Sequence, residues 1–169
     1  WTVPECNFQW RVLRDNVLAE VDRLSGLYQQ TLATHHVETL PERARVVGPH
    51  EVALASGRTV TARVILVATG AHPAVPAVPG AEHGITSNEV FHLETLPRRV
   101  VIAGGGYIAN EFAGIFHGFG AEVTLVNRSD EILRGYEAAI RDRLLQISLA
   151  KGIQYRFNTT FERIEKRAD

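Results

Sequence analysis

The spacing of apolar residues predicts a long amphipathic helix near the start of the chain. From Phe8 to about Thr34, apolar side chains recur every three or four positions and charged residues fill the opposite face. The apolar positions are Leu13, Val17, Leu18, Val21, Leu24, Leu27, Tyr28 and Leu32. We therefore expect one helix here, with its apolar stripe packed against another part of the protein.

The following segment alternates short extended stretches with turn residues. Strands are expected at residues 37–40, 44–47, 51–54 and 60–62, separated by turns at 48–50 and 56–57. Strands this short predict a small antiparallel meander. Residues 64–68, Val-Ile-Leu-Val-Ala, are apolar throughout, which is typical of a strand buried on both faces of a parallel sheet.

Three prolines, Pro73, Pro76 and Pro79, mark a boundary between two parts of the chain. Proline interrupts helices and sheet interiors, so residues 71–80 are expected to form an extended connector. Beyond it, the pattern predicts strands at 99–103, 122–126 and 153–157, with helices at 107–119 and 137–151. This β-α-β-α-β order predicts an α/β fold, namely the first half of a doubly wound, Rossmann-like sheet.

The strongest chemical signal is Gly-Gly-Gly-Tyr-Ile-Ala at residues 104–109, which matches G-x-G-x-x-G/A between a predicted strand and a predicted helix. Gly104 allows a tight turn, Gly106 lets the backbone approach a pyrophosphate, and Ala109 lets the helix pack closely on the strand. The N–H groups at the helix start would then face the phosphates. A glycine-rich turn without a ligand is the alternative.

The residues after the second strand predict which dinucleotide binds. Asn127 stands where a carboxylate would hold the ribose 2′-OH of NADH, and Arg128 and Arg134 follow it. Two guanidinium groups suit the 2′-phosphate of NADPH. Alternatively, both arginines are solvated surface charges, and the nearby Asp130 and Glu131 could pair with them. We expect NADPH rather than NADH.

Composition limits the function without suggesting another. The 169 residues include 18 basic and 19 acidic side chains, a net charge of -1 that gives no reason to expect a nucleic acid or a membrane as partner. No apolar run is long enough to cross a bilayer, and the single Cys6 can form no internal disulfide, so a cytoplasmic location is expected. The seven histidines show no metal-ligand spacing. Because the chain opens on Trp1 and ends in mid-pattern, we interpret it as a fragment.

Several motifs resemble the glutathione reductase family. They are Gly-Gly-Gly-Tyr-Ile-Ala-Asn-Glu-Phe-Ala-Gly-Ile-Phe at 104–116, Val-Asn-Arg at 126–128 and Ile-Leu-Arg-Gly at 132–135, with further similarity at 23–28, 79–83 and 86–89. The resemblance implies an FAD domain interrupted by an inserted NADPH domain. Residues 1–80 would be the later part of the FAD domain, 81–97 a connector and 98–169 the N-terminal part of the NADPH domain. Trypanothione reductase shares much of this pattern.

The resemblance also implies roles for individual residues. The implied NADPH contacts are Gly104, Gly105, Gly106, Ile108, Arg128 and Arg134, and the implied FAD contacts are Ala44, Thr69 and Gly70. Tyr107 matches a tyrosine that covers the flavin until nicotinamide displaces it. Glu111 matches a glutamate at the nicotinamide end, although spacing alone favours an ordinary helix-surface residue. Tyr28 matches a tyrosine of the disulfide substrate cleft, and a core aromatic is equally consistent with its spacing.

The sequence departs from the family pattern at three places. Asn110 replaces the usual apolar residue, Asn127 stands where an aromatic is common, and Pro41-Glu42 replaces a glycine-containing stretch before the adenine contact. The changes at 110 and 127 leave the expected pocket intact. The change at 41–42 weakens the assignment of Ala44.

The family mechanism needs more than this sequence contains. An N-terminal G-x-G-x-x-G, a Cys-x4-Cys pair and a C-terminal His-Glu pair are all missing from the 169 residues, and Cys6 is interpreted as structural or incidental. We expect the parent protein to be a homodimeric NADPH- and FAD-dependent reductase of a small-molecule disulfide, glutathione disulfide, with the fragment alone inactive and marginally stable. The alternatives are another NADPH flavoreductase and a stand-alone NADPH-binding module.

Overall fold

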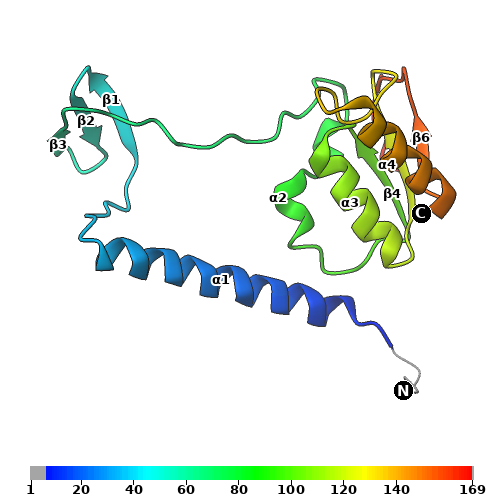
Figure 1. Ribbon diagram of the computed structural model, residues 1–169, viewed down its shortest axis with the longest axis horizontal. Coiled ribbons are helices and arrows are strands. Elements are labelled where there is room, and N and C mark those ends of the chain that lie inside the picture. Colours follow the sequence, from blue (N-terminus) through cyan, green and yellow to red (C-terminus); the bar gives the residue numbers. More distant parts are fainter. Residues whose placement is uncertain (1–6, 169) are drawn as a thin grey trace. The chain divides into compact units, whose positions relative to one another are not determined.

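The computed structural model describes residues 7–168, which divide into two compact units. One unit takes in the chain up to Val17 and from Pro73 onward, and the other runs from Leu18 to His72. The predicted long helix is confirmed as α1 (Trp10–Thr34), labelled in Figure 1. None of its residues is buried, so the expected packing of a full apolar stripe is wrong for this chain.

The second unit contains the predicted antiparallel meander. Strands β1 (Ala44–Gly48), β2 (Glu51–Leu54) and β3 (Thr59–Thr61) pair in the order β1-β2-β3. The strand predicted at 37–40 is wrong. Instead, the N–H group of Val37 donates to the carbonyl of Leu32 at 2.9 Å and closes the end of α1.

The apolar segment at residues 64–68 forms no strand, contrary to the sequence prediction. Val64, Leu66 and Val67 are 78%, 86% and 67% exposed. A strand requires hydrogen-bonding neighbours, and within residues 7–168 no strand pairs with this segment. The composition therefore fits a buried strand, whereas the structure supplies nothing to bury it.

The first unit contains the predicted β-α-β-α-β order. Its elements are β4 (Arg99–Ala103), α3 (Tyr107–Gly118), β5 (Glu122–Val126), α4 (Ala138–Lys151) and β6 (Gln154–Arg156). The three strands are parallel in the order β4-β5-β6. Ala103 pairs with Val126, which in turn pairs with Arg156, so the carboxyl ends of all three strands lie at one edge of the sheet.

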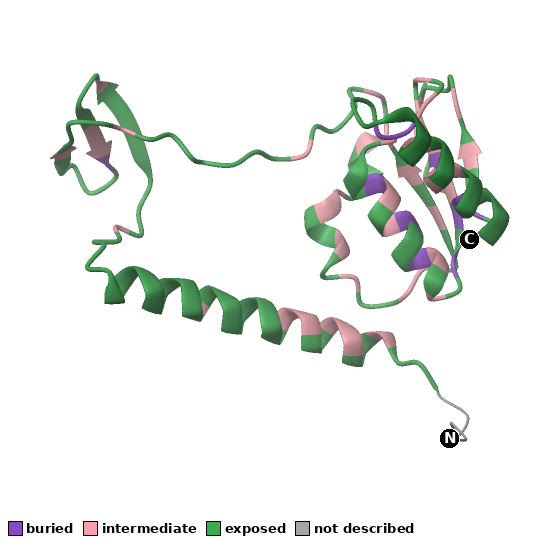
Figure 2. Cartoon of the chain, viewed as in Figure 1, coloured by how far each residue is buried: buried purple, intermediate pink, exposed green. Residues whose placement is uncertain are grey.

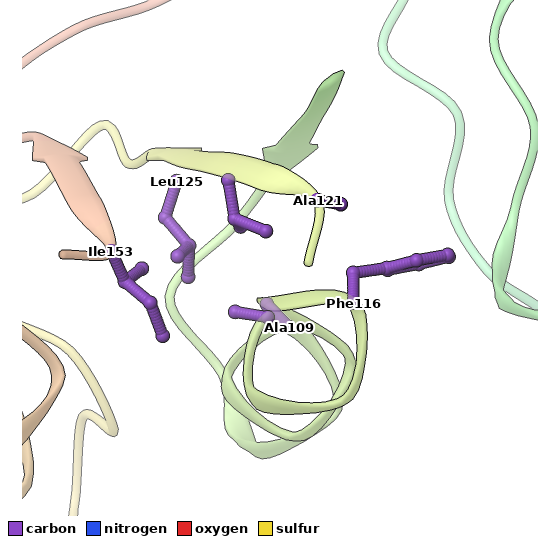
Figure 3. Close-up of a cluster of buried hydrophobic side chains, with 7 residues drawn as sticks. Ala109, Phe116, Ala121, Leu125 and Ile153 are labelled. Atoms are coloured by element: carbon purple, nitrogen blue, oxygen red, sulfur yellow. The ribbon is translucent and has the colours of Figure 1, made fainter. Parts of the chain in front are cut away.

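The core of this unit lies between α3 and the parallel sheet. Buried residues gather on these elements in Figure 2, and Figure 3 shows Leu125 and Ile153 directed toward α3. Ala109 and Ala113 are buried on the helix face that meets the strands. Their small side chains let α3 approach the sheet closely, as the glycine motif requires.

Residues 81–97 contain two short helices that the sequence analysis did not predict. They are the 3-10 helix η1 (Ala81–His83) and α2 (Ser87–Val90). A capping box begins α2: the Glu89 carboxylate accepts from the N–H of Thr86 at 2.7 Å, and the Thr86 hydroxyl accepts from the N–H of Asn88. The pattern Thr-x-x-Glu was therefore the available signal for this helix. The preceding residues, 71–80, contain no helix or strand, as predicted.

Specific contacts hold the N-terminal segment of the first unit. The indole N–H of Trp10 donates to the carbonyl of Leu93 at 2.7 Å, and the Phe8 ring stacks on Phe119 with centroids 4.4 Å apart. These contacts fix the first turn of α1 beside α3.

No helix within residues 7–168 is long and apolar enough to cross a membrane.

Candidate dinucleotide site at the glycine turn

Three glycines connect the end of β4 to the start of α3, at the edge where the parallel strands end. The N–H of Gly104 donates to the carbonyl of Val126 at 2.9 Å, which extends the pairing with β5 by one bond. Gly104 then turns the chain with φ +128°. A side chain strongly disfavours this conformation, so the backbone itself requires glycine here.

Gly105 and Gly106 are glycines for different reasons. A β-carbon at Gly105 would lie 2.7 Å from Nδ2 of Asn127, so any side chain there would displace the Asn127 amide from its hydrogen bonds. Gly106 has an extended backbone, φ -75° and ψ -180°, and a β-carbon there would meet no atom within 4 Å. Among residues 7–168, neither the backbone conformation nor a neighbouring atom requires glycine at this position, although glycine is also acceptable as an N-cap. The bare backbone leaves room for a ligand to approach.

The start of α3 presents its N–H groups beside this space. Gly106 is the N-cap and supplies no side-chain hydrogen bond, and the first N–H groups of a helix have no acceptor within the helix. Tyr107 and Ile108 are 56% and 43% exposed. Unpaired N–H groups and the helix dipole favour an anion at this end, as phosphate sites require.

The segment 128–134, here called the arginine loop, is anchored to the glycine turn. Ile132 and Leu133 are 2% and 8% exposed, and the N–H of Leu133 donates to the carbonyl of Gly105 at 2.7 Å. Leu133 has φ +50°, a conformation that costs energy for a residue with a side chain. Burial and the hydrogen bond hold Leu133 in this conformation and thereby attach the arginine loop to the glycine turn.

Asn127 organises the beginning of the arginine loop. Its amide nitrogen donates to the Ser129 hydroxyl at 2.9 Å and to the carbonyl of Glu131 at 2.7 Å. A carboxylate could not make the second bond, because a carbonyl oxygen requires a donor. The same nitrogen limits the space at Gly105. Asn127 therefore packs the loop against the turn and places no negative charge there.

Both predicted arginines project from this loop into solvent. Arg128 follows the end of β5, and Arg134 follows the buried pair that anchors the loop. The side chain of Arg134 is 83% exposed, and its Nε lies 3.9 Å from Oε1 of Glu131. An exposed pair at this distance contributes little, about 0–1 kcal/mol, so Arg134 is a solvated surface charge in this structure, as the alternative also expects. Each arginine adjoins a residue that contacts Gly105.

The remaining predicted residues are divided between the two units. Tyr107 and Glu111 are exposed on α3. Those of the second unit are Tyr28, Ala44, Thr69 and Gly70. Tyr28 is 72% exposed, Ala44 opens β1 opposite Leu54, and Gly70 has φ +71°. Cys6 lies outside the described residues.

The sequence analysis missed the contribution of Leu133. Its role depends on a left-handed backbone and on a bond to a carbonyl, for which an ordinary leucine gives no signal in sequence. Among residues 7–168, no cluster of three histidine, cysteine, aspartate or glutamate side chains could hold a metal ion. The candidate site consists of backbone N–H groups and guanidinium groups, both of which bind anions.

The parallel sheet, the glycine turn and the small residues of α3 together define an α/β protein of the Rossmann type. The chain belongs to the pyridine nucleotide-disulphide oxidoreductase family, which matches residues 4–169. The match covers both units.

Individual relatives agree with this assignment. The chain is 40% identical to the glutathione reductase of Burkholderia cepacia over 167 residues, which are 99% of this chain and 37% of that protein. It is 41% identical to the glutathione reductase of Nostoc sp. over 154 residues, 91% of this chain and 33% of that protein. The chain thus spans only about a third of the length of these two relatives.

A solved structure shows the same fold. The Cu(II) complex of RclA from Escherichia coli, an HOCl-induced flavoprotein disulfide reductase, superposes with a TM-score of 0.83 at 25% identity. The superposition covers 95% of this chain and 38% of that chain. The α/β fold with its parallel β4-β5-β6 sheet therefore matches part of a flavoprotein disulfide reductase.

Proposed function

We propose that this chain is the NADPH-binding part of a flavoprotein that reduces glutathione disulfide. One observation carries the cofactor assignment: Gly106 is a glycine that neither the backbone conformation nor the internal packing requires. A dinucleotide pyrophosphate against this backbone explains the residue. The relatives named glutathione reductase support the choice of substrate.

Within this site, each group has a distinct task. NADPH supplies a hydride when bound. The N–H groups of Tyr107 and Ile108 hold its pyrophosphate at the start of α3, where the helix dipole favours negative charge. Arg128 and Arg134 hold the 2′-phosphate through charge-assisted hydrogen bonds. Asn127 contributes by being neutral, because a carboxylate there would repel that phosphate.

The rest of the chain fits a second role, in FAD binding. Under this proposal residues 1–80 are the later part of an FAD domain, 81–97 connect it to the next domain, and 98–169 begin the NADPH domain. Ala44, Thr69 and Gly70 contact FAD. Tyr107 gates the nicotinamide pocket, Glu111 lies at its inner end, and Tyr28 lines the substrate cleft.

The complete activity requires groups that these 169 residues lack. The sequence has one cysteine, and none of its seven histidines matches the family's acid-base histidine, so under this proposal both the redox-active cysteine pair and that histidine belong to other parts of a longer polypeptide. We propose that this polypeptide is a cytoplasmic homodimer. Oxidised trypanothione is the alternative substrate, because trypanothione reductases share the motif at 104–135.

Dinucleotide preference tests the proposal directly. In the full-length, FAD-loaded protein, kcat/KM would be measured for NADPH and NADH with glutathione disulfide as acceptor, and then with oxidised trypanothione. We expect NADPH to be favoured at least tenfold, which corresponds to about 1.4 kcal/mol. Arg128→Ala and Arg134→Ala should each reduce this preference by weakening NADPH alone.

A matched control is available on α4. Arg143 is an exposed arginine of the same unit, so Arg143→Ala removes the same charge without touching the arginine loop. It should leave the preference unchanged. Equal use of both dinucleotides by the unaltered protein would refute the 2′-phosphate assignment, and absence of disulfide reduction with a bound flavin would refute the assigned activity.

A further inference from the structure

The side chain of Asn110, on the first turn of α3, contacts the glycine turn directly. Its amide nitrogen donates to the carbonyl of Gly105 at 3.1 Å and to the carbonyl of Gly106 at 2.8 Å. The first bond is partly buried and the second is exposed. An apolar side chain of similar size would make neither of them.

These two bonds reinforce the orientation of two peptide groups, whose carbonyls also accept from the backbone N–H groups of Leu133 and Asn110. No peptide bond among residues 7–168 is cis, and in a trans peptide the C=O and the following N–H point in opposite directions. Holding the carbonyls of Gly105 and Gly106 toward Asn110 therefore directs the N–H groups of Gly106 and Tyr107 away from it. This is the direction from which an anion reaches the start of the helix.

A residue of β6 fixes the orientation of the Asn110 amide. The Tyr155 hydroxyl donates to Oδ1 of Asn110 at 3.3 Å, so the amide oxygen faces the tyrosine and the amide nitrogen faces the turn. Partial burial raises the pKa of the Tyr155 phenol, so the hydroxyl keeps the proton that it donates. The Tyr155 ring stacks on Phe157 with centroids 5.6 Å apart. Tyr155 of β6 thus orients the Asn110 side chain, which in turn contacts the glycine turn.

We propose that Asn110, held by Tyr155, is a positioning residue that presets the N–H groups of the glycine turn for the pyrophosphate of the dinucleotide. This inference rests on the proposed function. It makes a prediction that the arginines do not. Because NADPH and NADH share the pyrophosphate, loss of Asn110 weakens both, whereas loss of Arg128 weakens NADPH alone.

The loss of Asn110 should leave the fold intact. The carbonyl of Gly105 keeps its bond from the N–H of Leu133, and the carbonyl of Gly106 keeps its bond from the backbone N–H of Asn110 itself. No buried carbonyl is therefore left without a donor. Leucine has a similar size and a higher helix propensity than asparagine. Asn110→Leu is thus a test of orientation.

The experiment uses the full-length, FAD-loaded protein and the variants Asn110→Leu and Tyr155→Phe. His117→Leu is the control, since it makes a similar polar-to-apolar change at the far end of α3. KM and kcat would be measured for NADPH and NADH, with a melting curve for each variant. We expect Asn110→Leu to raise KM about fivefold for both dinucleotides, the effect of one hydrogen bond of ordinary strength. Tyr155→Phe should raise both in the same proportion by a smaller factor, and kcat and the melting temperature should stay near the control.

Each other result has a definite meaning. Unchanged KM values in Asn110→Leu, with an active unaltered protein, would overturn the positioning role and leave the proposed function standing. A change in the NADPH-to-NADH ratio would overturn it too, because Asn110 would then act on the 2′-phosphate. If Asn110→Leu fails to fold, Tyr155→Phe decides alone. An unaltered protein that binds neither dinucleotide would refute the proposed function itself, and the positioning role with it.

Discussion

Adding a single methyl group at Gly106 should separate binding from folding. The backbone there is extended, and a β-carbon would meet no protein atom within 4 Å. Gly106→Ala therefore introduces neither strain nor a clash. Alanine is less favourable than glycine at an N-cap, which offsets the gain from restricting the unfolded chain, so stability should stay within about 1 kcal/mol of the unaltered protein. The proposed ligand is the only partner that the methyl group would meet.

The two preceding glycines supply the contrast. At Gly104, φ +128° makes alanine strained, at a cost of about 1–3 kcal/mol. At Gly105, the added carbon would lie 2.7 Å from Nδ2 of Asn127 and would push apart the turn and the arginine loop. Because 1 kcal/mol corresponds to about 2–4 °C in a chain of this size, Gly104→Ala should melt several degrees below Gly106→Ala.

Dinucleotide binding should follow a different order from stability. The methyl group of Gly106→Ala would stand between the backbone N–H groups and the phosphate, and a hydrogen bond to a charged group contributes about 1.5–3 kcal/mol. We expect NADPH affinity to fall at least tenfold, measured by calorimetry, while the melting temperature of Gly106→Ala is maintained. Normal NADPH binding by a stably folded Gly106→Ala would refute the placement of the pyrophosphate.

Three further outcomes are expected. Gly80→Ala should destabilise this unit by more than about 2 kcal/mol in urea unfolding, because φ is +81° and the added carbon would lie 1.8 Å from the carbonyl oxygen of Ile164; a smaller loss would mean that this contact is easily displaced. Phe116→Ala should cost about 3–5 kcal/mol by the same method, since Phe116 is only 3% exposed in the core; a cost below 1 kcal/mol would contradict its place there. The hydrogen bonds from Thr86 lower the pKa of Glu89, so the cap of α2 is stabilising above the ordinary glutamate pKa and is lost as pH falls through the lowered value. The amide resonance of Thr86 should report this loss by NMR, and Glu89→Gln should abolish its pH dependence.

Elements whose partners lie within the chain could be predicted from the sequence. The strands at 99–103 and 122–126 were predicted with the bounds that β4 and β5 have, because each is a short, largely apolar run followed by a predicted helix. The run at 64–68 carries the same signal, and the structure leaves it unpaired and exposed. Composition reports what a strand would bury, and it does not report whether a neighbouring strand is present.

The candidate site was predictable only in part, for a similar reason. The glycine spacing and the two arginines are properties of sequence, because each residue type suits a phosphate by itself. The roles inferred for Asn110 and Leu133 depend on which carbonyl lies opposite each donor after folding. Asn110 stood out in the sequence as a polar residue at a usually apolar position, yet only the folded structure shows that it contacts the glycine turn.

The bond between Leu133 and Gly105 has a consequence for cofactor engineering. Within the arginine loop, the residues that carry the backbone, Ile132 and Leu133, are distinct from the charged residues that face solvent. Because these two sets of residues are separate, Arg128 and Arg134 should be replaceable without loss of the contacts that anchor the loop to the glycine turn. Introducing two arginines into the corresponding loop of another protein should be less effective where that loop lacks such anchoring contacts, because the positive charges would be present without a defined position.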